Sequence, residues 1–235
     1  MKKILFAIVL IAATTFTSKA QKAFEKGDIT VDLGIGFGIY GTKTHTEVNR
    51  DVYYWNGSSL ALRKERVSDD TTDAAGATIY PLKVEYGVTN WLGVGARFAY
   101  SNYIEEKDSI TGIKPKFTSV DAGVVLNFHL VKSKRFDMPI SVNFGYSSFK
   151  YLSNDAVGGK GKDNGLNYGI GILPRIYFGD HIGMFFNLGY AGYTYPSIKF
   201  SNNTDSNLND DNGQDWLYKI KGSGMNIGIG LIGKF

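Results

Sequence analysis

Eight stretches of this chain alternate between apolar residues and small or polar ones, and no other feature limits the possible folds so strongly. The stretches lie at residues 29–39, 80–88, 92–101, 119–129, 140–147, 166–178, 182–191 and 225–235. A two-residue period is that of a β-strand whose two faces meet different surroundings. None of the eight apolar faces carries a charged residue. A wall that faces lipid requires this, because Lys or Arg at the bilayer midplane costs about 2–4 kcal/mol. The pattern predicts an all-β fold, an eight-stranded antiparallel transmembrane up-and-down β-barrel.

The charged residues of these stretches share the opposite face, which would point into the barrel. They are Asp32, Lys83, Glu85, Arg97, Asp121, Arg175 and Lys234. The interior of an eight-stranded barrel is just wide enough for its side chains. We therefore predict that the first six form a lumen polar network that plugs the barrel, in which Arg97 bridges Glu85 and Asp121. A gated polar path is the alternative. An unpaired buried charge is strongly destabilising, so Arg97→Ala should lower barrel stability.

The connections between the stretches alternate between long and short. The long ones run from Gly41 to Thr78, over 104–116, over 152–164 and from Pro196 to Lys219, and the short ones over 89–91, 131–138 and 179–181. Outer-membrane barrels have long extracellular loops and short periplasmic turns. The alternation therefore places both termini in the periplasm.

Two local features bear on the strand count. Pro174 lies on the apolar face of the sixth stretch and removes a ladder hydrogen bond there. Asn56-Gly57, in the first long connection, is a hairpin signal that could raise the count from eight strands to ten. We favour a hairpin outside the membrane, because continuing the register would turn Arg50 toward lipid.

Aromatic residues form two bands along the apolar faces. Those at the long-connection ends are Tyr80, Tyr100, Tyr146, Tyr168 and Tyr190, and those at the short-turn ends are Tyr86, Trp91, Phe128, Phe178 and Phe235. Amphipathic rings favour the two membrane–water interfaces, so these residues are predicted to form aromatic girdles.

The N-terminus predicts a cleaved signal peptide at residues 1–20, followed by a single barrel domain at 21–235. Basic Lys2 and Lys3 precede a short apolar core, and Ser18 and Ala20 provide small residues at the cleavage site. Cleavage would leave 23 basic residues against 22 acidic ones, so the charge gives no reason to expect a nucleic-acid partner. Cysteine is absent, which excludes disulfides and thiolate metal sites.

The signal ending Ser18-Lys19-Ala20, the turn at 86–95 and the last stretch together resemble the small outer-membrane β-barrels of Gram-negative bacteria, the OmpA/OmpX/OmpW-like group often labelled "porin family". The resemblance implies localisation in the outer membrane and contact with its lipid and lipopolysaccharide. It also implies periplasmic chaperones and the barrel-assembly machinery as partners during biogenesis. By analogy, the assembly signal would be Ile227, Ile229, Leu231 and Phe235, although Gly233 departs from the bulky residue often found two positions before the end.

The sequence gives little indication of catalysis or metal binding. Some eight-stranded barrels modify lipids with His and Ser near the outer leaflet, but no strand here carries a His-x-Ser pair. His45, His129 and His181 are therefore expected to be solvated or hydrogen-bonded. The acidic segment 205–215 does not fit an EF-hand loop, because Lys219 stands where the bidentate Glu belongs. We expect no catalytic residues, metal or cofactor.

The sequence thus favours a non-enzymatic structural or surface-interaction protein that acts through the connections from Gly41 to Thr78 and from Pro196 to Lys219, with an unidentified surface ligand. A narrow porin or hydrophobic-solute channel is the alternative, and an outer-leaflet lipid-modifying enzyme is a weaker one.

Overall fold

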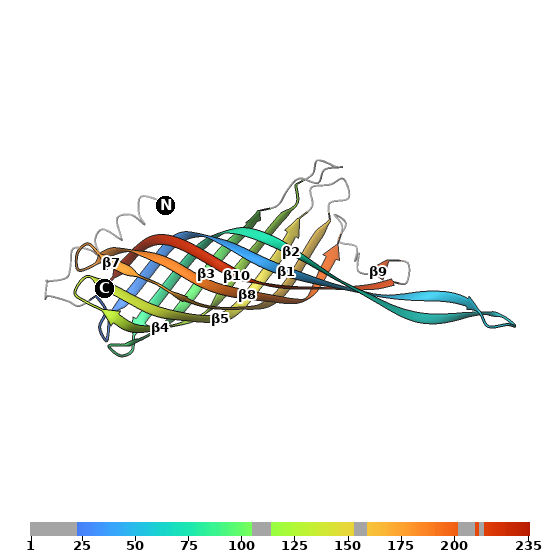
Figure 1. Cartoon of the computed structure of the whole chain (residues 1–235), viewed down its shortest axis with the longest axis horizontal. Helices are drawn as coiled ribbons and strands as arrows, with labels where there is room; N and C mark the ends of the chain where they lie inside the picture. Colours follow the sequence, from blue (N-terminus) through green and yellow to red (C-terminus); the bar gives the residue numbers. More distant parts are fainter. Residues whose placement is uncertain (1–22, 105–113, 153–158, 202–209, 212–213) are drawn as a thin grey trace.

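The computed structural model describes residues 23–104, 114–152, 159–201, 210–211 and 214–235, and it is an all-β structure (Figure 1). The strands are β1 (Ile29–Trp55), β2 (Leu60–Gly87), β3 (Leu92–Ile104), β4 (Lys116–Lys132), β5 (Phe136–Leu152), β6 (Lys160–Ile172), β7 (Arg175–Tyr177), β8 (Ile182–Ser201), β9 (Asp210–Asp211) and β10 (Gln214–Lys234). The predicted signal peptide lies outside the described residues. Within them, no helix is long and apolar enough to cross a membrane.

The strands close into a ring of antiparallel pairs. Each of β1 to β5 pairs with the next strand, β6 and β7 both lie between β5 and β8, and β8 pairs with β10. The ring is closed by β10 and β1, which pair from Thr30 opposite Lys234 to Asn49 opposite Asp215. At the end of this seam, Ile29 and Phe235 exchange both backbone hydrogen bonds at 2.9 Å. The eight-stranded barrel and its closure by the last stretch are confirmed, because β6 and β7 are two parts of one wall strand and β9 pairs with β10 outside the ring.

The sixth predicted stretch is interrupted at Pro174, which has no backbone N–H to donate. The Pro174 carbonyl still accepts a hydrogen bond from the Phe186 N–H at 2.9 Å, and the Leu173 N–H donates to the Pro139 carbonyl at 3.0 Å. Alternation continues across the break, with Ile172, Ile176 and Phe178 outward and Leu173, Arg175 and Tyr177 buried inside. The break therefore divides the strand without turning its faces over.

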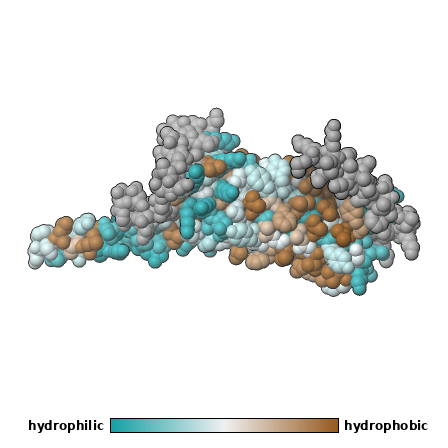
Figure 2. Space-filling model, turned by 180° about the vertical axis from the view of Figure 1, so that it is seen from behind, coloured by the Kyte–Doolittle hydropathy of each residue, from teal (hydrophilic) through white to brown (hydrophobic). Residues whose placement is uncertain are grey.

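The outer face of the barrel is apolar, as Figure 2 shows in brown over its middle. Leu33 and Leu231 are 62% and 65% exposed, values that no soluble core would show. Such a band of exposed aliphatic side chains around a closed sheet is the surface of a transmembrane β-barrel.

The first long connection is mostly strand. β1 and β2 stay paired from Tyr40 opposite Ala75 to Trp55 opposite Leu60, so a two-stranded ribbon extends far beyond the barrel (Figure 1). At its tip, Gly57 has a φ of 94°, and the Asn56 side-chain oxygen accepts hydrogen bonds from the backbone N–H groups of Ser58 and Ser59. The predicted hairpin is confirmed, but the expected loop around it is corrected: residues 41–75, here called the protruding hairpin, continue the wall strands.

The last long connection is also shorter than predicted. β8 continues to Ser201 and β10 begins at Gln214, so both strands run into the segment expected to be a loop from Pro196 to Lys219. The side chains of 202–215 lie outside the description, and with them the acidic segment 205–215 that was compared with an EF-hand loop.

Candidate functional site

The barrel interior carries a layer of buried charges near the short-turn end, centred on Arg175 of β7. One guanidinium nitrogen, Nη2, donates to Asp32 Oδ2 at 3.0 Å and to Glu85 Oε2 at 2.7 Å. The other, Nη1, lies 3.5 Å from Asp137 Oδ2. Arg175 and Asp137 are fully buried, and Asp32 and Glu85 almost so. One guanidinium thus holds carboxylates from β1, β2 and β5 together across the lumen.

His129 of β4 connects two of the same carboxylates. Its Nε2 lies 2.7 Å from Glu85 Oε1, and its Nδ1 lies 2.8 Å from Asp137 Oδ2. Both ring nitrogens can donate at once only in the imidazolium form, so this geometry suits a charged His129. The ring of Phe24 stacks on the imidazole, with centroids 3.4 Å apart and planes within 4°. We call Asp32, Glu85, His129, Asp137 and Arg175 the charge layer.

A glycine gives the charge layer its shape. A Cβ at Gly93 would collide with the Glu85 carboxylate, which lies over this residue of β3. Gly93 therefore leaves the space in which Glu85 reaches Arg175 and His129.

Asp121 of β4 collects hydrogen bonds farther along the lumen. Ser147 Oγ donates to Asp121 Oδ1 at 2.6 Å, and the Tyr193 hydroxyl donates to Oδ2 at 3.3 Å. Arg97 Nη1 lies 3.6 Å from the same Oδ2, close enough for an ion pair but too far for a hydrogen bond.

The predicted bridge from Arg97 to Glu85 is wrong. Arg97 is the register partner of Lys83, whereas Glu85 stands opposite Gly95. Arg97 and Glu85 are therefore offset by two residues along the strands, a distance of about 7 Å. The Glu85 carboxylate instead contacts Arg175 and His129.

Beyond Asp121, aromatic side chains fill the barrel interior toward the protruding hairpin. The buried members of this aromatic layer are Tyr40, Phe149, Tyr193, Tyr195 and Ile198, with Ala77, Ile79 and Ala99 on the walls. Tyr103 and Phe117 pack against them. The Phe149 ring centroid lies 5.0 Å from that of Tyr195, and the Tyr40 ring meets Tyr193 edge-on at 5.5 Å. Such contacts stabilise aromatic clusters beyond their buried area.

The structure places the six predicted lumen residues inside the barrel, but in two groups. Asp32, Glu85 and Arg175 belong to the charge layer, and Arg97 lies beside Asp121, with Lys83 next to Arg97. His129 and Asp137 were missed as members. The sequence predicts that Asp137 lies in a turn over 131–138, but β4 and β5 are separated by residues 133–135 alone. Extending the alternation of β5 back from Ser141 through Pro139 to Asp137 would have found it.

The predicted girdle residues lie on the outer face. Tyr80, Tyr100, Tyr146, Tyr168 and Tyr190 are each 40–49% exposed. Tyr80 and Tyr100 are cross-strand partners with ring centroids 6.2 Å apart, and at the other rim Trp91 and Phe128 lie 6.3 Å apart. Tyr86 and Phe178 are exposed there as well. Ile227, Ile229 and Leu231 also face outward, and Phe235 ends the seam with β1; their role as an assembly signal remains a prediction.

One face of the protruding hairpin carries a ladder of charges. Asp70 Oδ1 lies 2.7 Å from His45 Nδ1 and Asp70 Oδ2 lies 2.9 Å from Lys43 Nζ, and Arg66 donates a hydrogen bond to Glu47. Hydrogen bonds from Lys43 and then His45 lower the pKa of the Asp70 carboxyl, and the bond from Arg66 lowers the pKa of Glu47. His45 is thus hydrogen-bonded, as is His181, whose Nδ1 lies 2.9 Å from the Lys234 carbonyl oxygen.

The tip of the protruding hairpin is apolar on the same face. Tyr53 stands opposite Leu62 and Trp55 opposite Leu60, and these four side chains are 51–68% exposed. We call them the tip patch.

No protein-family model and no curated protein matches this sequence. Among solved structures, the outer membrane protein OprG from Pseudomonas aeruginosa is similar with a TM-score of 0.50 and 12% identity, over 90% of this chain and 97% of that one. Ail, the attachment invasion locus protein of Yersinia pestis, matches with a TM-score of 0.40 and 17% identity, over 89% of this chain and 99% of that one. At this identity, the likeness to OprG shows the fold alone, which is that of the small outer-membrane β-barrel proteins.

Proposed function

We propose that this protein is a non-enzymatic outer-membrane β-barrel whose lumen is closed to solutes and which acts at the cell surface through its protruding hairpin. The observation that carries the proposal is the tip patch. Its four large apolar side chains stand exposed on a ribbon that extends beyond the lipid-facing band, and exposed apolar clusters of this kind mark interaction sites.

The orientation that this function needs follows from barrel architecture. The protruding hairpin lies at the end of the barrel where β3, β5 and β8 end, whereas the short turns and the C-terminus share the other end (Figure 1). Outer-membrane barrels keep short turns in the periplasm, so the hairpin would stand outside the cell. Lipopolysaccharide around the wall, and chaperones and the barrel-assembly machinery during biogenesis, are the partners expected of such a protein.

The closed lumen is supported by the charge layer and the aromatic layer. Both span the interior, one near each end, and both consist of buried side chains in mutual contact. A narrow porin remains the second candidate, because a polar cavity of about 50 Å³ lies between the layers.

Planar-bilayer recording on refolded protein separates these two functions. A closed lumen gives no single-channel steps, once heat-modifiable gel mobility has shown a folded barrel. Stable, uniform steps would overturn the closed lumen in favour of transport.

Surface action is tested by adhesion of cells that display the protein. Replacing Tyr53 and Trp55 with serine should reduce adhesion to immobilised glycoprotein and to other cells, because it removes half of the tip patch. Tyr80→Ser on the barrel wall is the control for loss of an exposed aromatic ring. Equal adhesion of the tip variant and the wild type on every surface would contradict the proposed role. An outer-leaflet enzyme would require an activity that His45→Ala abolishes.

A further inference from the structure

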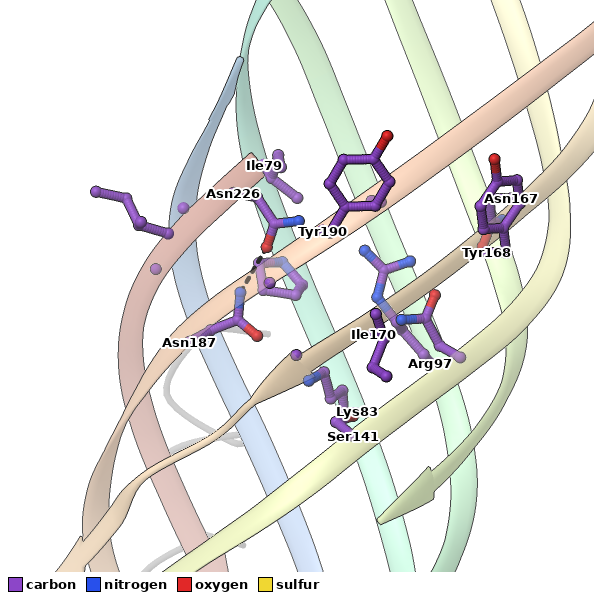
Figure 3. Close-up of a pocket in the computed structure, with 18 of the residues that line it drawn as sticks. Ile79, Lys83, Arg97, Ser141, Asn167, Tyr168, Ile170, Asn187, Tyr190 and Asn226 are labelled. Atoms are coloured by element: carbon purple, nitrogen blue, oxygen red, sulfur yellow. Dashed lines mark hydrogen bonds between the residues drawn. The ribbon is translucent and has the colours of Figure 1, made fainter. Parts of the chain in front are cut away.

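The cavity between the two layers is lined by donors of hydrogen bonds and by positive charge. Figure 3 shows Lys83 and Arg97 side by side, with Ser141, Asn167 and Asn187 around them. Asn143 and Asn226 also line it. The lining contains two basic residues and no carboxylate.

Lys83 is a buried charge without a direct ion-pair partner among the described residues. It is 7% exposed, and within the described residues it makes no ion pair within 4.0 Å and no hydrogen bond. Its register partner on β1 is Asp32, whose Oδ2 accepts from Arg175 and whose Oδ1 has no hydrogen-bond partner among the described residues, but the Lys83 ammonium forms no ion pair with this carboxylate within 4.0 Å. A buried ammonium without a paired anion is costly.

Arg97 and Ser141 add further donors. The ion pair of Arg97 with Asp121 is 3.6 Å long and uses one nitrogen, so the remaining N–H groups of this fork are free to bind elsewhere. The Ser141 hydroxyl is buried and has no hydrogen-bond partner among the described residues. Two cations and an unsatisfied hydroxyl therefore face one space.

The amides complete the arrangement. The Asn187 side-chain NH₂ donates to the Asn226 carbonyl oxygen at 2.6 Å, which leaves the NH₂ of Asn226 available to the cavity. Amide and hydroxyl donors around a basic pair are suited to a negatively charged guest.

We infer that this cavity binds a small inorganic anion between Lys83 and Arg97. A cavity volume of about 50 Å³ exceeds the roughly 10–15 Å³ that is needed to hold one water molecule, so the cavity has room for a small anion such as chloride, bromide or nitrate. The anion compensates Lys83, which has no carboxylate oxygen within 4.0 Å among the described residues, and it reduces the repulsion between Lys83 and its neighbour Arg97. The inference does not depend on the surface role of the hairpin.

Bromide provides the direct test. Crystals of the refolded wild-type barrel grown in sodium bromide should show an anomalous scattering peak within hydrogen-bond distance of Lys83 and Arg97. Absence of a peak in the cavity would overturn the inference, even if peaks appear on the outer surface. This measurement needs no variant to fold.

Thermal unfolding provides a second test in solution. At equal ionic strength, chloride should raise the wild-type Tm relative to gluconate, which is too large for the cavity, by roughly 3–6 °C at about ten times the Kd. Lys83→Met should abolish the difference, and Lys221→Met, which removes an exposed lysine outside the cavity, should keep it. A chloride effect that survives in Lys83→Met would place the anion elsewhere and refute the site.

Discussion

Replacing Arg175 with methionine removes the one guanidinium that three buried carboxylates share. Asp32 and Glu85 lose hydrogen bonds of 3.0 and 2.7 Å, and Asp137 loses a cation at 3.5 Å. Methionine fills a similar space but satisfies none of these groups. Glu85 and Asp137 then keep His129 as a cation within hydrogen-bond distance, whereas Asp32 keeps no ion pair among the described residues.

The expected cost is large because all four residues are buried. Each hydrogen bond to a charged group contributes about 1.5–3 kcal/mol. Removing one partner of a buried ion pair typically costs about 3–5 kcal/mol, since the other charge stays behind. Arg175→Met should therefore lower the free energy of unfolding by about 3–5 kcal/mol. Arg175→Lys should recover part of this loss, because an ammonium keeps the charge but loses the planar fork.

Urea titration in lipid vesicles, with the folded fraction read from heat-modifiable gel mobility, measures this loss. Arg97→Met is the matched control. Arg97 makes one ion pair, at 3.6 Å, and Asp121 would keep its hydrogen bonds from Ser147 and Tyr193, so removal of Arg97 should cost less than removal of Arg175, about 1–3 kcal/mol. If Arg175→Met unfolds within about 0.5 kcal/mol of the wild type, the charge layer does not hold the barrel together and the argument fails.

Three further predictions concern separate parts of the molecule. Gly93→Ala should destabilise the barrel by about 1–3 kcal/mol in the same titration, because its methyl group would collide with Glu85, whereas Gly179→Ala, which meets nothing within 4 Å, should be neutral. Because the folded-state pKa of Asp70 lies below 3.8, its stabilisation of the hairpin is complete above about pH 4 and is lost as the pH falls through the folded value. The protection factors of amides 43–48, which correct for the pH dependence of intrinsic exchange, should therefore fall in acid, and Asp70→Asn should lower them already at neutral pH; wild-type protection factors that do not change with pH would contradict this. Trp55→Ser should leave the unfolding midpoint unchanged, because the side chain is exposed beyond the barrel, and a shift would show that the tip patch packs against the barrel.

The barrel could be predicted from the sequence because lipid imposes a strict rule on every second residue. A single charge on an outward face is costly, so each wall strand can be recognised separately from its uncharged apolar face. The alternation of the last stretch also predicts that it pairs with the first stretch and closes the barrel. Pro174 shows the limit of that rule. Alternation locates the strand but does not reveal that the ladder divides at the proline.

The sequence predicts which residues face the interior better than it predicts which of them pair with one another. Alternate residues of a strand face opposite sides of the wall, so the pattern identifies Glu85, Arg97 and Arg175 as facing the lumen. Which of them touch depends on register and on reach across the barrel, and neither is written in one strand. Arg97 was paired with Glu85 because the two are close along the sheet, whereas Arg175 reaches Glu85 from the opposite wall.

The hairpin was underestimated for a related reason. Residues 41–75 carry polar residues on both faces, so the alternation that marks a lipid-facing strand disappears although the backbone pairing continues. Outside the membrane, a ribbon is held by main-chain hydrogen bonds and cross-strand charges such as Lys43 with Asp70.

Phe24 gives the short-turn end a property of its own. This residue precedes β1, is fully buried, and lies flat on His129, while the neighbouring Ala23 N–H donates to the Ser133 carbonyl at 3.1 Å. Phe24 therefore covers the charge layer and separates it from the water at the short-turn end of the barrel. Removing the residues before Asp28 would leave every wall strand in place but would uncover His129. Water would then reach the imidazole, and the protonation of His129 would depend on the pH of the surroundings.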